Sequence, residues 1–288
     1  MLVALSHDRH LGRMRGEFVD LDGCRLYYFA AGTRGAGEPV IFIHGFPAAS
    51  HLWSDVVRDF PAGHRLVVVD LLGFGRSDRP TNSSLTAGAH AERVLKLMDD
   101  LRIETACVVG HGMGGAVAQQ LAVHAATRVT RLALVNSTAF DAWPRGAARL
   151  ARAVAGTPLA RVLGAALLAG LAHPSLLRGF ADREEGRHAL DHYLRAFTTR
   201  LGTDALIAQL RAMRDDRVAT LGERLGEINA PTAVIWGAND PWLPVALGER
   251  LRDAIPGATL EVIPGARHFT PNDAPERVAA AVGSLLAR

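Results

Sequence analysis

Residue types that could do chemistry occur in four short motifs, each placed where a predicted strand ends. In chain order these are His44-Gly45-Phe46-Pro47, Asp70-Leu71-Leu72-Gly73-Phe74-Gly75-Arg76-Ser77, Val109-Gly110-His111-Gly112-Met113-Gly114-Gly115, and the pair Gly237-Ala238-Asn239-Asp240-Pro241 and Gly265-Ala266-Arg267-His268. Histidine gains and loses a proton near neutral pH, so it is the side chain most suited to acid–base work. The motifs therefore point to acid–base chemistry at the end of a sheet that carries all of them.

Predicted strands and predicted helices, which must position these motifs, alternate along the chain. The predicted strands are 17–21, 25–30, 40–43, 66–70, 106–110, 132–136, 233–236 and 260–263. The predicted helices are 51–60, 85–101, 115–124, 245–254 and 274–286. The later strands are apolar throughout, as in a parallel sheet that is covered on both faces. This alternation predicts an α/β fold with a central, mostly parallel sheet.

The alternation stops between about residues 140 and 225. This segment contains no convincing strand, is rich in alanine, leucine and arginine, and is broken by Pro144, Pro158 and Pro174. We interpret it as a helical insertion between two strands of the sheet. The predicted organisation is a core domain of residues 1–138 and 227–288 with a helical cap, or lid, of residues 139–226.

The composition is that of a folded globular protein, with 288 residues, 49% hydrophobic residues and 21% charged residues. Its net charge of +3 comes mainly from arginines scattered among 29 acidic residues, which argues against a nucleic-acid partner. The longest apolar run, 162–172, is too short to span a bilayer. We expect a cytoplasmic protein without a membrane partner, with free thiols at Cys24 and Cys107, and leave its oligomeric state open.

The ordered motifs resemble the α/β-hydrolase family, and the resemblance covers nearly the whole chain from about residue 17. It implies an eight-stranded, mostly parallel sheet flanked by helices, with a helical cap inserted after the sixth strand. It also implies that His268 is a catalytic base and Asp240 its orienting carboxylate, which would fix the ring tautomer and stabilise the imidazolium. The backbone N–H groups of Phe46 and Met113 would form the oxyanion hole.

The sequence departs from the family at the nucleophile elbow, G-x-S-x-G, because Gly112 stands at its centre. Glycine has no side chain with which to form an acyl-enzyme or an alkyl-enzyme ester. The glycines at 110, 112 and 115 match the dinucleotide fingerprint G-x-G-x-x-G, but the next predicted strand ends at Asn136-Ser137 without the required acidic residue. We therefore predict no nucleotide cofactor, and no metal.

Three interpretations stay open. In the first, the enzyme keeps His268–Asp240 as an acid/base dyad for non-covalent chemistry, such as proton abstraction, elimination, cyclisation, carbon–carbon cleavage or direct attack by water. In the second, a hydrolase with a serine or aspartate nucleophile, of esterase, epoxide hydrolase or dehalogenase type, carries an engineered Gly112. In the third, the protein is a non-catalytic binder of small molecules.

Different parts of the chain resemble different branches of the family. Residues 44–47 and 70–80 resemble haloalkane dehalogenases and epoxide hydrolases, which use aspartate at the elbow. Met113-Gly114-Gly115 resembles the serine esterases and carbon–carbon hydrolases, so we prefer serine as the ancestral residue. The apolar cap predicts a small hydrophobic substrate. The candidate pocket residues are His44, Ser137, Trp143, Tyr193 and Trp242.

Overall fold

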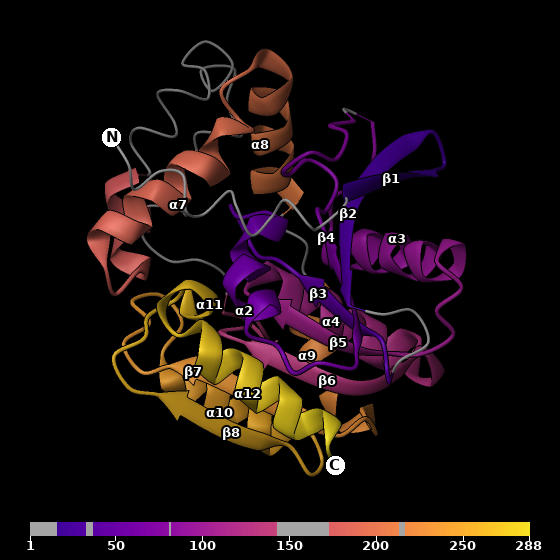
Figure 1. Ribbon diagram of the computed structural model, residues 1–288, viewed down its shortest axis with the longest axis vertical. Helices are drawn as coiled ribbons and strands as arrows, with labels where there is room; N and C mark the ends of the chain where they lie inside the picture. Colours follow the sequence, from indigo (N-terminus) through magenta and orange to yellow (C-terminus); the bar gives the residue numbers. More distant parts are fainter. Residues whose placement is uncertain (1–15, 33–36, 81, 143–172, 213–216) are drawn as a thin grey trace.

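The computed structural model describes residues 16–32, 37–80, 82–142, 173–212 and 217–288. Within these ranges eight strands form one sheet in the order β1-β2-β4-β3-β5-β6-β7-β8 (Figure 1). The pairs β1–β2 and β2–β4 are antiparallel, and every other pair of neighbours is parallel. The predicted eight-stranded, mostly parallel sheet is therefore confirmed.

All eight strands overlap the predicted ones. They are β1 (Gly16–Leu21), β2 (Cys24–Gly32), β3 (Val40–Ile43), β4 (Arg65–Val69), β5 (Ala106–His111), β6 (Val129–Val135), β7 (Thr232–Gly237) and β8 (Thr259–Ile263). Every residue of β3, β5 and β7 is buried, whereas β1 and β8 at the edges keep exposed positions. The continuous apolar runs of the sequence are therefore the central strands, whose two faces are both covered.

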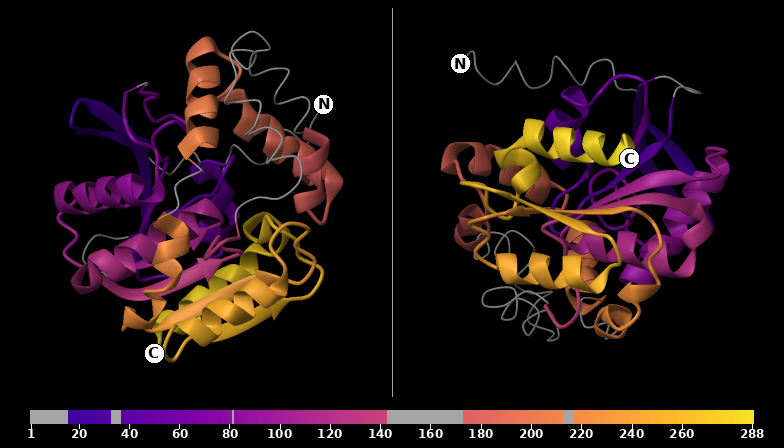
Figure 2. Two further views of the ribbon diagram at one scale, coloured as in Figure 1. Left: turned by 180° about the vertical axis from the view of Figure 1, so that it is seen from behind. Right: turned by 90° about the horizontal axis from the view of Figure 1, so that it is seen from below.

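Helices cover both faces of the sheet. The described helices are α2 (Ser54–Arg58), α3 (Ala87–Asp100), α4 (Met113–His124), α7 (Arg183–Arg195), α8 (Arg200–Ala212), α9 (Arg217–Gly222), α10 (Val245–Ala254), α11 (Thr270–Asp273) and α12 (Pro275–Leu286), with the short 3-10 helices η1 (Ser50–Trp53), η2 (Ala126–Arg128), η3 (Leu177–Gly179) and η4 (Leu225–Glu227). Figure 2 shows α2 and α12 on one face, and α3, α4 and α10 on the other. Each of these helices is too short or too polar to reach across a lipid bilayer.

Helix α4 links the site to the core. It packs on β3, β5 and β6, and its residues from Met113 to Ala122 are all buried between the sheet and α3. Its glycines permit a close approach, because a Cβ on Gly114 would collide with the carbonyl oxygens of Ile43 and His44. The amino end of α4 is therefore held tightly against the end of β3.

In its described residues, the segment between β6 and β7 contains η3, α7, α8, α9 and η4. Figure 1 shows α7 and α8 outside the two helical layers, beyond one end of the sheet. Helix α7 begins where the side chain of Asp182 accepts hydrogen bonds from the backbone N–H groups of Glu184 and Glu185, at 2.7 and 3.2 Å. The cap boundaries at 139 and 226 stay a prediction, and residues 143–172 of that segment lie outside the described residues.

Both cysteines are free thiols, as predicted. Cys107 is buried within β5, and burial raises its thiol pKa far above the ordinary value. It is therefore a neutral packing residue rather than a reactive thiolate.

Candidate active site

The four motifs meet at one end of the sheet. Parallel strands place their carboxyl ends at the same edge, which is where ligands bind in open α/β sheets. Residues His44, Gly112 and Asn136 directly follow or end β3, β5 and β6, and Asp240 follows β7 by a short turn. His268 arrives from the loop that follows β8.

His268 and Asp240 form a hydrogen-bonded pair. Nδ1 of His268 lies 2.8 Å from Oδ2 of Asp240, and the two side chains are 9% and 0% exposed. The other carboxylate oxygen of Asp240 accepts hydrogen bonds from the backbone N–H groups of Trp242 and Leu243, at 2.9 and 3.0 Å. The sequence prediction that these two residues lie together agrees with this geometry.

The environment keeps the Asp240 carboxylate ionised. Burial alone would raise its pKa, but the charge of His268 and the hydrogen bonds from His268, Leu243 and Trp242 hold the pKa below its ordinary value. With an ionised partner, the proton on His268 belongs on Nδ1, where it is donated to Asp240. This leaves Nε2 with a free electron pair, so Nε2 is the proton acceptor of the pair.

Nε2 of His268 faces the position that a nucleophile would occupy. Gly112 is the N-cap of α4 and has φ 53° and ψ −120°, a backbone conformation that L-residues rarely adopt. A Cβ built on Gly112 would lie 3.6 Å from Nε2 of His268 and 3.6 Å from Cα of Gly45. Both are ordinary contact distances, so the turn has the room and direction of a nucleophile elbow without the nucleophile.

Hydrogen bonds fix the backbone of this turn. The N–H of Gly112 donates to the carbonyl of Val135 at 3.2 Å. The carbonyl of Gly112 accepts hydrogen bonds from the N–H of Gly115 and from both the N–H and the hydroxyl of Thr138, at 3.0 to 3.1 Å. The positive φ of Gly112 is thus maintained by its neighbours and does not depend on a side chain at this position.

The two expected oxyanion donors, Phe46 in the loop after β3 and Met113 at the start of α4, belong to segments that lie close together. A Cβ on Gly45 would be 2.8 Å from the carbonyl oxygen of His111 and 3.3 Å from Cα of Gly112. Met113 is the first residue of α4, where a backbone N–H has no partner within its own helix. Neither amide donates a hydrogen bond to any residue that the structure describes.

The other candidate pocket residues occupy different surroundings. Both ring nitrogens of His44 are engaged, with the carbonyl of Gly45 at 2.9 Å and the N–H of Leu71 at 3.0 Å. Burial lowers the pKa of His44, so it is a neutral residue that ties two loops together. Ser137 is fully buried, donates to the carbonyl of Thr138 and accepts from the Gln119 amide.

Two aromatic candidates lie closer to the dyad. The Trp242 ring packs edge-on against the His268 ring, with centroids 4.8 Å apart. Tyr193 of α7 is buried, and its hydroxyl donates to Oδ1 of Asn272 at 3.1 Å, which ties α7 to α11. Burial raises the pKa of the Tyr193 hydroxyl far above its ordinary range. Trp143 lies outside the described residues.

His111 supports the loop that carries His268. Its Nε2 donates to the carbonyl oxygen of His268 at 2.9 Å, and the two rings lie 4.9 Å apart. Burial, followed by the charge of His268, lowers the pKa of His111 to about 3, so its ring is neutral. The contact ties the end of β5 to the loop that carries His268.

Asn136, directly after β6, contacts the dyad although no sequence motif selected it. Its Nδ2 donates to Oδ2 of Asp240 at 2.7 Å, the same oxygen that faces His268. Its Oδ1 accepts from the N–H of Gly237 at 3.1 Å and from the hydroxyl of Thr270 at 2.7 Å. It is fully buried and has φ 40°. A polar residue ending a buried strand was the available signal, because asparagine tolerates positive φ.

The segment after η3 lies directly on the His268 loop. The rings of Phe180 and Phe269 stack with centroids 4.2 Å apart. Asp273 bridges the two segments, accepting from the N–H of Ala181 at 2.9 Å and from the N–H of Arg267 at 2.7 Å. Burial raises the pKa of Asp273 to about 6 despite these hydrogen bonds. In the part of the chain that the structure describes, no cluster of three histidine, cysteine or acidic residues could hold a metal.

Comparison with known proteins places this geometry in a family. Residues 38–275 match the model of the α/β hydrolase fold. The chain belongs to the α/β-hydrolase family. Over 98% of both chains it is 28% identical to haloalkane dehalogenase 2 of Mycobacterium tuberculosis. Over 86% of both chains it is 30% identical to a 2-hydroxy-6-oxononadienedioate/2-hydroxy-6-oxononatrienedioate hydrolase of Cupriavidus pinatubonensis.

Solved structures agree with the family. An α/β-hydrolase-fold protein from Burkholderia ambifaria superposes with a TM-score of 0.80 at 27% identity, covering 92% of this chain and 96% of that one. Relatives of this α/β-hydrolase chain thus include a haloalkane dehalogenase as well as a hydrolase of 2-hydroxy-6-oxo-dienedioates. The relatives therefore carry different names within the one family.

Proposed function

We propose that the chain is an α/β-hydrolase-fold enzyme that works without a covalent nucleophile. In this proposal His268 and Asp240 act as an acid/base dyad, and the backbone N–H groups of Phe46 and Met113 stabilise a developing oxyanion. The observation that carries it is the direction of His268 Nε2, which faces a position 3.6 Å away where Gly112 offers no side chain. This supports a base that acts on the substrate or on water instead of on a nucleophile side chain.

The dyad has the features of a general base. The ionised Asp240 accepts a hydrogen bond from Nδ1 of His268, with 2.8 Å between Nδ1 and Oδ2. It would stabilise the imidazolium that forms when Nε2 takes a proton. Asn136 restrains the carboxylate through a second hydrogen bond at 2.7 Å. Proton transfer by a positioned histidine typically contributes ~10²–10⁴-fold to a rate, which is sufficient for a useful enzyme.

The reaction class follows from what surrounds Nε2. A substrate carbonyl that accepts the N–H groups of Phe46 and Met113 would place its neighbouring carbon near His268. His268 then removes a proton from that carbon, and the electron pair moves onto the carbonyl oxygen as an enolate. The imidazolium returns the proton to the product or to a leaving group. Proton abstraction, elimination and cyclisation through an enolate share this step. In carbon–carbon cleavage His268 would instead take the proton of a hydroxyl group on the substrate, and the electron pair of the breaking C–C bond would form the enolate. A water beside Gly112 would attack an activated substrate directly.

The substrate we propose is small and hydrophobic. Trp242 packs on His268, and Phe180 and Phe269 stack beside it, so aromatic surface borders the dyad. The proposed cap, residues 139–226, would cover this end of the sheet above the core domain of residues 1–138 and 227–288. One relative acts, by its name, on an oxo-dienedioate, and a ketone is the type of group that an oxyanion hole accepts.

A proton-transfer probe tests the base directly. Nitrobenzisoxazole opens to a coloured nitrophenolate when a base removes its ring proton, so turnover reports a positioned base without knowledge of the natural substrate. We expect His268→Ala to lower this rate by ~100-fold or more. His188→Ala, at an exposed histidine of α7, is the matched control and should leave it unchanged. Equal rates for the native chain and His268→Ala would overturn the proposed base.

A fluorophosphonate probe tests the absence of a nucleophile. Such probes form a stable bond with an activated serine, which intact-protein mass spectrometry detects as an adduct. The native chain should remain unlabelled, whereas Gly112→Ser should be labelled. Labelling of the native chain at any residue, including Ser137, would show that a covalent nucleophile exists and would refute the proposal.

A further inference from the structure

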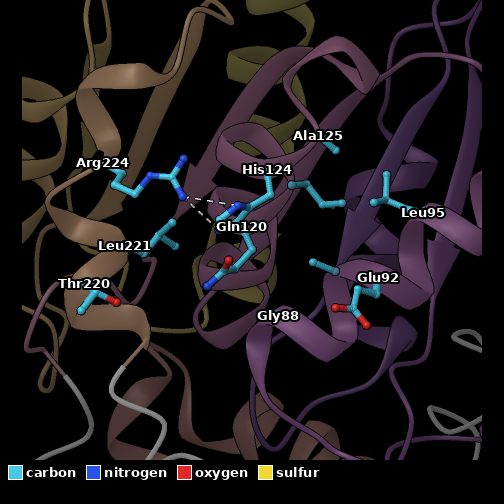
Figure 3. A pocket seen from close by; sticks show the side chains of 11 residues that line it. Gly88, Glu92, Leu95, Gln120, His124, Ala125, Thr220, Leu221 and Arg224 are labelled. Carbon is cyan, nitrogen blue, oxygen red and sulfur yellow. Dashed lines mark hydrogen bonds between the residues drawn. The ribbon is translucent and has the colours of Figure 1, made fainter.

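A pocket of about 540 Å³ lies between α3, α4 and α9, away from the dyad. Figure 3 shows α4 as its floor, with α3 and α9 as opposite walls. Its floor residues lie at the carboxyl end of α4, whereas Gly112 precedes the amino end; they are Gln120, Leu121, His124 and the C-cap residue Ala125. The pocket therefore lies one helix length away from the dyad and shares no lining residue with it.

A glutamine amide without a protein partner lines this pocket. Gln120 is only 5% exposed as a whole residue, and no hydrogen bond joins its side-chain amide to another described residue, but solvent still reaches the amide atoms. Figure 3 shows the amide pointing into the pocket, toward the wall that carries Thr220 and Leu221. The preceding residue, Gln119, shows the ordinary case: its amide donates to three oxygen atoms, those of Gly115, Ser137 and Thr138.

Because the Gln120 amide faces the pocket and has no protein partner, a ligand that enters the pocket can form hydrogen bonds with it in place of solvent. Gln120 offers both a donor and an acceptor to whatever enters the pocket. The contrast with Gln119 on the same helix indicates that Gln120 is placed to meet an external polar group.

Opposite charges flank this amide. Glu92 stands on the α3 wall and Arg224 on the α9 side, with Gln120 between them (Figure 3). Arg224 uses Nε and Nη2 to hold Glu227, while Nη1 lies 3.4 Å from Nδ1 of His124 and faces the pocket side. The carboxyl end of α4 adds partial negative charge near the floor, which favours a cation. A ligand with an ammonium toward Glu92 and a carboxylate toward Arg224 would match both charges.

The remaining lining is apolar and would accept a hydrocarbon side chain. Leu95, Leu121 and Leu221 come from the three helices, and Ala91 widens the space between them. The volume falls within the usual range for small-molecule sites. We propose that this pocket binds a small zwitterion, namely a free α-amino acid with an apolar side chain or a dipeptide of the same character.

Calorimetric titration with leucine and two analogues tests this proposal. Leucinamide lacks the carboxylate and N-acetylleucine lacks the ammonium, so each removes one of the two charges. We expect leucine to bind the native chain at least tenfold more tightly than either analogue. Equal affinities for all three compounds, or binding of none of them, would overturn the proposal.

Variants identify the site. Gln120→Leu keeps a similar side-chain volume without the amide and should weaken leucine binding at least tenfold. Glu92→Gln removes a charge at the exposed rim of the pocket, so it should also weaken leucine binding at least tenfold and should leave the fold intact. Arg252→Gln, at an exposed arginine of α10, is the matched control. Leucine binding that survives both Gln120→Leu and Glu92→Gln would place the ligand elsewhere. His268→Ala should bind leucine normally, which separates this site from the proposed dyad.

Discussion

Gly112→Ser should turn the elbow into a working nucleophile. The missing Cβ position is 3.6 Å from Nε2 of His268, and a serine hydroxyl extends one C–O bond beyond it. A suitable rotamer would bring Oγ within ~2.6–3.2 Å of Nε2, the reach needed for proton transfer from nucleophile to base. The oxyanion formed by attack on an ester would then lie near the amides of Phe46 and Met113.

The size of the effect follows from the geometry. A positioned base contributes ~10²–10⁴-fold, so ester hydrolysis by Gly112→Ser should exceed that of Gly112→Ala by ~100-fold at least. Both variants place a Cβ at φ 53° and ψ −120°. This strain costs ~1–3 kcal/mol, and each kcal/mol corresponds to ~2–4 °C in Tm for a chain of this size class. Both melting temperatures should therefore fall by several degrees and to the same extent.

Stopped-flow hydrolysis of p-nitrophenyl acetate is the assay. Gly112→Ser should release a burst of nitrophenolate equal to the enzyme concentration as the acyl-enzyme forms, followed by a slower steady state. Gly112→Ala controls for strain and volume, because it differs only by the hydroxyl. If Gly112→Ser melts like Gly112→Ala and gives no burst, the inferred alignment of elbow, base and oxyanion hole is wrong.

Three further changes probe the surroundings of the dyad. Asn136→Gly keeps the positive φ but removes the amide that holds the dyad carboxylate. Nitrobenzisoxazole turnover should fall ~10-fold, and the free energy of unfolding, measured in urea, should fall by ~2–4 kcal/mol. An unchanged turnover rate would argue against a positioning role for Asn136. Asp273 has a folded pKa of about 6, above its unfolded value of ~3.9, so its contribution to stability is complete below pH ~4 and decreases by ~2 kcal/mol as the pH rises through 6. The difference in unfolding free energy between the native chain and Asp273→Asn should therefore fall between pH 4 and pH 7. A difference that does not change with pH would contradict this prediction. Gly45→Ala would put a Cβ 2.8 Å from the carbonyl oxygen of His111 and displace the oxyanion loop, lowering the ester activity of Gly112→Ser by ~100-fold, whereas Gly226→Ala, whose Cβ meets nothing closer than 4.0 Å, should not.

The fold was readable from the sequence because it rests on local patterns. Runs such as 40–43 and 106–110 are apolar throughout, and the structure buries every residue of the corresponding strands. Where the prediction was imprecise, the cause is also local. The helix predicted over 51–60 is divided into η1 and α2, and α3 begins after Thr86, whose hydroxyl accepts from the N–H of Ala89 at 3.3 Å.

The site was only partly readable, because some of its contacts join residues far apart in the chain. His268 and Asp240 were predicted from motifs and lie within hydrogen-bond distance. Asn136 was missed, since it meets Asp240 across a separation of 104 residues and its pattern looks like an ordinary strand end. His44 was expected near the pocket, but its ring nitrogens are occupied by backbone groups of two loops. The sequence motifs thus identified site residues, but their hydrogen-bond partners became known only from the folded structure.

The backbone of the Gly112 turn also has an evolutionary consequence. Serine codons of the AGC type and both aspartate codons are one base change from glycine codons. A change of that kind at this turn relieves ~1–3 kcal/mol of strain, so the glycine protein would fold at least as well as its predecessor. The reverse change would reintroduce that strain. Loss of the nucleophile therefore costs no stability, whereas its recovery does. A lineage that has lost the nucleophile would regain it only if the new serine or aspartate gave an immediate gain in catalysis.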